Sequence, residues 1–292
     1  MRHFPLPIFA GQAKNRGVIP LEDNVGDIIG KAQRGLGITN ETLREQTGIT
    51  QAQLRSLKTA KPEEAALRKV AAVLRLGAEQ LITIAEGVWR PEPAPRLPGF
   101  ALFNLPYGDI TVNAYLVWDV NTRQAVVFDS GAGAAPILAA VKKERLNVEL
   151  VLITHAHIDH VVALPDIMKA TGAKAWINAR EAGEEDFPKN VETFTTGQSF
   201  VLGQLRIETR LTSGHSAGQT TFVVKGLERL LAVVGDSLFA GSMGGGMVSY
   251  SDQLRNNLEQ ILTLPDHTIL ACGHGPLTTV GEEKRHNPFF TG

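Results

Sequence analysis

The residues best suited to chemistry lie in one short stretch, where three histidines and an aspartate fall within seven residues. Thr154–His160 reads THAHIDH and follows the largely apolar run VELVLI. Two imidazoles at positions i and i+2 of an extended segment project to the same side, so His155 and His157 can bind one metal ion together. Asp159 and His160 are adjacent and cannot both point with that pair. Their position predicts a second ion beside the first.

Two ions need more ligands than these four, and the chain offers three more at expected strand ends beside glycine. They are His215 in TSGHSAGQT, Asp236 in VVGDSLF and His274 in ACGHGP. Glycine lets the backbone turn so that each side chain can point into a shared cleft. By chance, the pattern His-x-His-x-Asp-His should occur in roughly one chain in several thousand of this length. This rarity favours a metal site over an accidental cluster.

Alternating strand and helix patterns are expected to position these residues in the downstream part of the chain. ALFNLP, VNAYLVWD and QAVVFDS have the pattern of strands, and PILAAVKKE has that of a helix. Upstream, residues 24–85 have a helical period, with Val25, Ile28, Ile29 and Ala32 on one face. Arg90–Gly99 contains four prolines, which favour an extended connector. We therefore expect an N-terminal arm (1–23), a helical domain (24–89), a linker (90–99) and an α/β domain (100–292).

Composition places the chain among ordinary globular proteins. Its 292 residues are 43% hydrophobic and 20% charged, and the formal net charge of −1 gives no general attraction to polyanions. The single cysteine, Cys272, cannot form an intrachain disulfide and is interpreted as a buried small hydrophobic residue. No apolar run reaches the roughly 18 to 20 residues of a membrane span. A cytoplasmic protein without a membrane partner is expected.

The ordered set of seven candidate ligands resembles that of the metallo-β-lactamase superfamily from Phe100 to the C-terminus. Within it, THAHIDH, GDSLFAGS and GHGPLTTVGEEKRHNPFF are similar to the glyoxalase II-like hydrolases. The resemblance implies an αββα sandwich with a smaller all-α N-terminal domain. It assigns His155, His157 and His215 to the first ion and Asp159, His160 and His274 to the second, with Asp236 bridging them.

Asp129, in VVFDSGAG, matches an aspartate that such proteins place near the site. It is either the partner that orients a ligand histidine or a turn-forming residue. Both interpretations stay open at this point.

The expected chemistry is hydrolysis at two divalent cations, zinc in the first place, with iron or manganese as alternatives. Water shared between them becomes hydroxide and attacks the carbonyl of a thioester, lactone or similar small-molecule ester. Asp236 and Asp159 are the candidate catalytic carboxylates, and Asp159 could also orient the nucleophile or accept its proton.

The sequence departs from the glyoxalase II pattern in two places. It has no counterpart of that family's helical glutathione-binding domain. The loop GSMGGGMVSYSD is interpreted as a mobile lid in which Ser249 and Tyr250 touch the substrate, with a plain surface loop as the alternative. A mononuclear iron persulfide dioxygenase would use His155, His215 and Asp236. Its Arg-Thr-Asp-Phe element is missing here, which favours hydrolysis.

The upstream helices contain a pattern typical of a helix-turn-helix. In Glu41–Ala60, Gly48 marks the turn and Thr50 is expected to cap the following helix. The segment resembles Cro/repressor-type domains, which implies binding of duplex DNA by residues 24–89 in a homodimer and a transcriptional regulator with a metabolite-sensing hydrolase domain as a further alternative. A dimerisation or lid module is the competing interpretation. The candidate DNA-contacting residues are Gln51, Gln53, Arg55 and Lys58.

Overall fold

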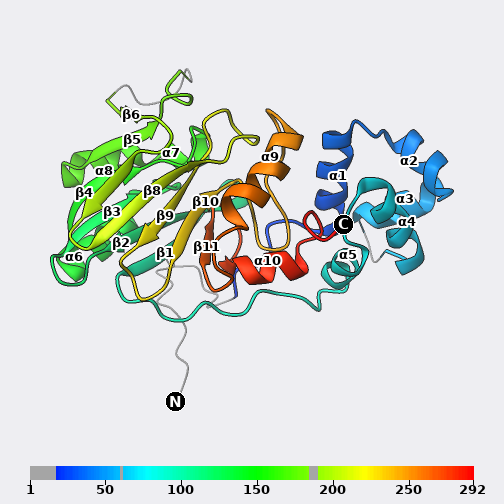
Figure 1. The fold of residues 1–292 in the computed structure, drawn as a ribbon, viewed down its shortest axis with the longest axis horizontal. Coiled ribbons are helices and arrows are strands. Elements are labelled where there is room, and N and C mark those ends of the chain that lie inside the picture. Colours follow the sequence, from blue (N-terminus) through cyan, green and yellow to red (C-terminus); the bar gives the residue numbers. More distant parts are fainter. Residues whose placement is uncertain (1–17, 60–61, 184–189) are drawn as a thin grey trace, which may run out of the picture.

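Two six-stranded β-sheets form the larger part of the chain, and a helical domain lies at one end (Figure 1). The computed structural model describes residues 18–59, 62–183 and 190–292. Most of the arm expected at residues 1–23 is therefore outside the described residues. Within these ranges, no helix combines the length and apolar character needed to cross a membrane.

The first sheet has the strand order β1 to β6, and the second has the order β12 to β7. In the first sheet β1, β2 and β3 are antiparallel, whereas β3 to β6 run parallel. Its strands are β1 (Phe100–Tyr107), β2 (Ile110–Trp118), β3 (Gln124–Phe128), β4 (Asn147–Leu152), β5 (Lys174–Asn178) and β6 (Glu192–Phe194). The second sheet contains β7 (Ser199–Leu202), β8 (Leu205–Leu211), β9 (Thr220–Lys225), β10 (Leu231–Gly235), β11 (Ile269–Cys272) and β12 (Thr278–Thr279).

Strand β3 shows how the sequence builds the layers. Val126 and Phe128 belong to the apolar cluster between the two sheets, whereas Ala125 and Val127 belong to the cluster on the outer face. Successive side chains of a strand point to opposite faces, so a continuous apolar run is buried on both sides. Phe128 packs against Phe222 of the second sheet at a ring-centroid distance of 5.4 Å. Full burial of such a side chain contributes roughly 1.5–3 kcal/mol.

Helices cover both outer faces and complete the expected αββα layering. The outer face of the first sheet packs against α6 (Ala134–Glu144) and α8 (Leu164–Thr171). The second sheet packs against the short π-helix Asn257–Ile261, which continues α9 (Tyr250–Asn256), and against α10 (Val280–His286). One further short helix, α7 (Ile158–Val161), lies within the candidate metal-binding stretch.

The helical domain has its own apolar core. Five helices span residues 25–85: α1 (Val25–Leu36), α2 (Asn40–Thr47), α3 (Gln51–Thr59), α4 (Glu64–Leu74) and α5 (Ala78–Ala85). Gly48, at φ +68°, ends α2, since its left-handed conformation favours glycine. The Thr50 hydroxyl accepts a hydrogen bond from the Gln53 amide at 3.1 Å, the cap that the sequence predicts. Residues 90–99 form neither helix nor strand and run to β1.

Buried contacts join the helical domain to the α/β domain. Lys31 of α1 forms an ion pair with Asp23 and donates a hydrogen bond to the Met243 carbonyl at 2.8 Å. The Ser242 hydroxyl donates to Asp23 at 2.5 Å. Farther along α1, a Cβ on Gly35 would overlap the ring of Tyr250 in α9. Met243 and Phe289 are part of the helical domain's apolar cluster, so the two domains share a packed surface.

Candidate metal centre

All seven candidate ligands follow strand ends that meet at one edge of the two sheets. Thr154–His160 follows β4, and His215 lies in the turn between β8 and β9. Asp236 directly follows β10, and His274 follows β11 with one residue between them. Side chains at the ends of neighbouring strands converge, which is how His155 and His274, 119 positions apart in the sequence, come together.

The side chains form two sets of three potential donors. In the first set, one nitrogen each of His155, His157 and His215 lies within 4.8 Å of the others. In the second set, one carboxylate oxygen of Asp159 and one nitrogen each of His160 and His274 lie within 4.8 Å of one another. The two sets are those that the resemblance assigns to the first and second ions.

Asp236 lies between the two sets. Its Oδ2 is 3.4 Å from His215 Nε2 in the first set and 3.5 Å from His274 Nε2 in the second. Its Oδ1 is 3.3 Å from His160 Nε2. If ions were bound by the two sets, a carboxylate in this position could be shared between them.

Three donor atoms of the cluster are fully buried without a hydrogen-bond partner. They are His155 Nε2, His160 Nε2 and Asp236 Oδ1. A buried polar atom without a partner costs roughly 1–3 kcal/mol. Imidazole and carboxylate groups are also the donors that zinc, iron and manganese accept. Both observations fit a site for metal ions.

Hydrogen bonds at the other ring nitrogen fix the orientation of several histidines. His160 Nδ1 lies 2.9 Å from Asp129 Oδ2, His215 Nδ1 lies 2.9 Å from the Gly245 carbonyl, and His274 Nδ1 lies 2.6 Å from the Thr111 carbonyl. When Nδ1 carries the proton, each ring presents an unprotonated Nε2 to the cluster. Such partners hold the tautomer and ring angle that a metal requires.

Asp129 combines the two roles that its sequence left open. Besides His160, its carboxylate accepts hydrogen bonds from the Thr154 amide at 2.7 Å and the Thr154 hydroxyl at 2.9 Å. Its φ of +52° lies in the left-handed region. The aspartate therefore turns the chain after β3 and also joins that turn to His160.

The protonation of the cluster is uneven. Burial lowers the pKa of His155 well below its usual value and also lowers that of His215. Burial opposes protonation of His160 and His274 as well, but Asp236 and other carboxylates raise their pKa values to about 10 and about 11. Burial likewise opposes ionisation of Asp236, yet His274 and His160 hold its pKa well below 3.8. In the absence of metal, His160 and His274 are therefore protonated at neutral pH and pair with the ionised Asp236.

A family model described as "Metallo-beta-lactamase superfamily" matches residues 107–274, more than half of the chain. The chain belongs to the metallo-beta-lactamase superfamily. It is 31% identical over 207 residues to the probable metallo-hydrolase YqgX of Bacillus subtilis, covering 64% of this chain and 96% of that protein. It is 28% identical to the hydroxyacylglutathione hydrolase GloC of Haemophilus influenzae, with the same coverage of both chains. The crystal structure of TTHA1623 in a di-iron-bound form is similar with a TM-score of 0.54 and 28% identity, covering 64% of this chain and 99% of that one.

Glu181 is a residue of this metallo-beta-lactamase domain that the sequence analysis missed. It is 3% exposed, and its carboxylate accepts hydrogen bonds from the amides of Ala156, at 2.9 Å, and Gly218. Ala156 stands between two candidate ligands, and Gly218 is three residues after His215. One buried carboxylate thus joins the two loops of the first donor set. An isolated glutamate in AREAGEED carries no motif that would have revealed this.

Glu283 is a second buried carboxylate, located in α10. It is fully buried and accepts hydrogen bonds from the Thr278 hydroxyl and the Asn287 side-chain amide, both at 2.7 Å, and from the Gly241 amide at 3.1 Å. Burial raises the pKa of Glu283 to about 8, although these hydrogen bonds lower it in part. The neighbouring charged group is Glu282, which raises it further.

This shift predicts a pH dependence of stability. Because the folded-state pKa of about 8 exceeds the ordinary value of 4.5, the stabilising contribution of Glu283 is complete below pH 4.5 and is lost as the pH rises through 8. Over that window this group should lower the free energy of unfolding by about 1.4 kcal/mol per pH unit. We expect Glu283→Gln to remove this slope, measured by urea unfolding at several pH values. Equal slopes in the variant and the wild type would contradict the assignment.

The residues expected to touch substrate have structural contacts of their own. Tyr250 packs against Gly35 and lies 6.5 Å from the Phe289 ring, and burial raises the pKa of its hydroxyl to about 12. Ser249 caps α9, since its hydroxyl accepts a hydrogen bond from the Asp252 amide at 3.2 Å. Substrate contact by either residue stays a prediction.

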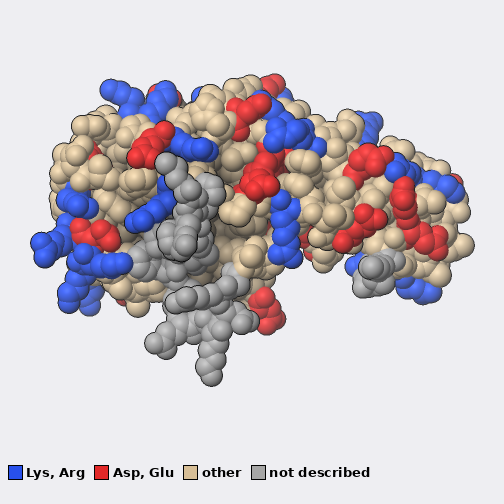
Figure 2. All heavy atoms as spheres, turned by 90° about the horizontal axis from the view of Figure 1, so that it is seen from below, with Lys and Arg blue, Asp and Glu red and all other residues tan. Residues whose placement is uncertain are grey.

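The helical domain differs in part from the DNA-binding expectation. Gln51 and Arg55 are exposed on α3. Gln53 instead accepts from the Thr50 amide at 2.9 Å and donates to Glu63 at 2.9 Å, and Lys58 donates to Asn40 at 3.1 Å. Gln53 and Lys58 therefore have partners inside the domain. On the face seen in Figure 2, acidic and basic side chains are interspersed over this domain, so that face has no uniformly basic patch. DNA binding stays a prediction of the sequence.

Proposed function

We propose that this protein is a dinuclear metal-dependent hydrolase that cleaves a thioester, lactone or similar activated ester. The observation that carries the proposal is the pair of three-donor sets with Asp236 between them. The di-iron-bound relative and the hydroxyacylglutathione hydrolase among the similar proteins support it. Zinc is the ion we propose for both positions.

The residues present fit two ions, one held by the first donor set and one by the second, with Asp236 shared. Bound divalent cations supply two effects: they bring the pKa of water towards neutrality and they withdraw charge from a carbonyl oxygen. The protein's part is to hold the donors in place. Asp129 orients His160, and the Gly245 and Thr111 carbonyls orient His215 and His274.

Asp159, which belongs to the second donor set, is also the carboxylate that we assign to proton handling. Its side chain is 14% exposed, whereas that of Asp236 is 9% exposed, and its Oδ2 lies 3.2 Å from His274 Nε2. A carboxylate at the accessible side of the cluster can accept a proton at Oδ2 and pass it to solvent. The oxygens of the deeper Asp236 face three histidines, so we assign Asp236 to metal binding alone.

Metal content and turnover test the proposal together. We expect about two ions per chain in protein purified without added metal, and hydrolysis of a panel of acyl thioesters and lactones. Removal of the ions by a chelator should abolish turnover, and zinc should restore it, because no serine or cysteine nucleophile is required.

One outcome would favour a mononuclear iron persulfide dioxygenase over the dinuclear hydrolase. About one iron per chain and no other metal, with oxygen consumption in the presence of a persulfide, would contradict the dinuclear hydrolase and support the mononuclear dioxygenase.

A further inference from the structure

Glu22, which precedes α1, lies beside the second donor set. A Cβ on Gly275 would be 3.1 Å from the Glu22 backbone nitrogen and 3.4 Å from its Cβ. Gly275 directly follows His274, and its carbonyl accepts a hydrogen bond from Asn113 at 2.8 Å, which fixes this turn. The helical domain's leading segment therefore contacts the turn that carries a candidate ligand, outside the residues that the family model matches.

The carboxylate of Glu22 has no counter-ion of its own. Its neighbour Asp23 is paired with Lys31 and Ser242. Glu22, by contrast, has no hydrogen bond or ion pair within residues 18–59, 62–183 and 190–292, although it is half-buried. Burial raises its pKa, and the charges of His274 and Asp236 act on it in opposite directions, which places the carboxyl within the field of the donor cluster.

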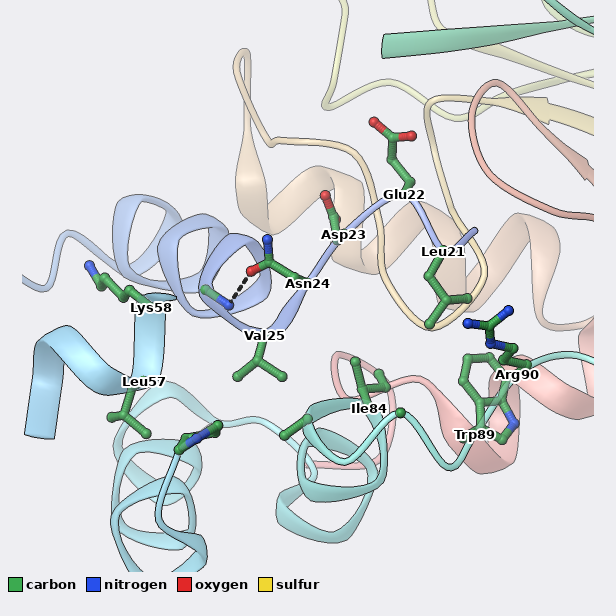
Figure 3. Close-up of a pocket in the computed structure, with 14 residues that line it drawn as sticks. Leu21, Glu22, Asp23, Asn24, Val25, Leu57, Lys58, Ile84, Trp89 and Arg90 are labelled. Carbon is green, nitrogen blue, oxygen red and sulfur yellow. Dashed lines mark hydrogen bonds between the residues drawn. The ribbon is translucent and has the colours of Figure 1, made fainter. Parts of the chain in front are cut away.

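The Glu22 side chain points in a direction that agrees with its place beside the His274 turn. Glu22 and Asp23 border a cavity of about 560 Å³ whose lining residues all belong to the helical domain and the segments directly flanking it. Figure 3 shows Val25, Leu57 and Ile84 around the cavity, whereas the Glu22 carboxylate points away from them, towards the α/β domain. Glu22 therefore presents its charge on the side of the metal centre.

The other end of the cluster is bordered by apolar side chains. The ring of His157 is 4.6 Å from that of His215, and the ring of His274 is 5.4 Å from that of His160. Beside His157, Ile158 is 49% exposed. Beside the His215 turn, the Val248 amide donates to the Gly214 carbonyl at 2.9 Å, and Val248 and Met247 are 61% and 71% exposed. Exposed apolar side chains thus lie by one end of the cluster, and the Glu22 carboxylate lies by the other.

We propose that Glu22 is a specificity-determining residue, and that the site takes esters or thioesters with an apolar acyl group and a cationic leaving group. The acyl group lies by Ile158, Met247 and Val248, and the cation lies by Glu22. An unpaired, half-buried carboxylate attracts an ammonium and repels a carboxylate more strongly than an exposed one does. This inference rests on the proposed hydrolase function and names its substrate class.

The reaction itself is ordinary hydrolysis. The water oxygen bonds to the acyl carbon, the carbon–sulfur bond breaks, and the thiol leaves with one of the water's protons while the acid keeps the other. Glu22 takes no part in these steps. Its charge selects which leaving groups bind beside His274.

Three butyryl thioesters that differ in charge test the inference on the zinc-loaded full chain. They are butyrylthiocholine, its neutral carbon isostere made from 3,3-dimethylbutanethiol, and the anionic thioester of 3-mercaptopropionate. We expect kcat/KM to fall about five- to tenfold at each step of this series. In Glu22→Gln, the kcat/KM values for butyrylthiocholine and its neutral isostere should differ by less than about twofold. Glu86→Gln, an exposed glutamate of the same domain, should keep the wild-type order.

Binding gives a readout that does not depend on turnover. Calorimetric titration of the full chain with the S-butyl thioether of thiocholine should show weaker binding to Glu22→Gln than to wild type by the same five- to tenfold. Turnover of all three thioesters without a charge preference, or a preference that Glu22→Gln retains, would overturn the inference and leave the hydrolase intact. Failure to cleave any thioester or lactone would instead reject the proposed function, and the inference with it.

Discussion

Replacing Asp236 with alanine is expected to lower the hydrolytic rate at least a thousandfold, to roughly the background of the metal-free protein. Asp236 approaches members of both sets, within 3.3 to 3.5 Å of three histidine nitrogens. Its loss removes a ligand from each proposed ion and also the negative charge that offsets two divalent cations. Bound metal should fall below two ions per chain.

The fold should survive this change. Asp236 belongs to none of the apolar clusters that form the core of the sandwich. Steady-state kinetics, metal analysis and circular dichroism on the same preparation separate loss of the site from loss of the fold. Asp266→Ala is the matched control, because that aspartate is 66% exposed and pairs only with Lys284. A variant Asp236→Ala with two bound ions and full turnover would remove the dinuclear mechanism.

Glu181→Ala should have the second largest effect, and it should act on both stability and turnover. The substitution leaves the amides of Ala156 and Gly218 buried without an acceptor. Each such group costs roughly 1–3 kcal/mol, so a loss of about 2–5 kcal/mol in the free energy of unfolding is expected. The loops of His157 and His215 lose their common anchor, and outer partners of metal ligands typically contribute 10- to 100-fold to affinity or activity.

Two measurements distinguish this positioning role from simple destabilisation. Zinc affinity and kcat, both taken well below the variant's unfolding temperature, should fall together. Glu192→Ala, which replaces a glutamate of β6 with a 53% exposed side chain, should leave both unchanged. Wild-type zinc affinity in a destabilised Glu181→Ala would show that the carboxylate supports the fold alone.

The parts of the site that the sequence could predict are those encoded by local spacing. His155, His157, Asp159 and His160 fall within six residues, so their convergence follows from strand geometry alone. His215, Asp236 and His274 needed the glycine context and the family resemblance. The alternating strands and helices of this part were likewise predictable from their periods, whereas the αββα layering came from the family resemblance.

The remaining features depend on contacts between segments that no local pattern connects. Glu181 acts on residues 25 positions before it and 37 positions after it. Tyr250 looked like a lid residue because its loop is rich in glycine, yet α1 approaches it through Gly35, a packing of two domains. Gln53 looked free to read a base, but the cap of its own helix and Glu63 use its amide. Each difference has the same physical origin, namely partners set by tertiary packing.

The ion pair of Lys31 and Asp23 limits which helical domains could replace the native one in an engineered chimera. The pair is 13% and 8% exposed, holds the backbone at Met243 and sets the Lys31 ammonium 4.8 Å from the centre of the Phe239 ring. Phe239 in turn packs edge-on against His274. A chimera that exchanges the helical domain for another would thus have to import a lysine and an aspartate at matching places. Without them, the swap would disturb a candidate metal-binding histidine that the graft never touches directly.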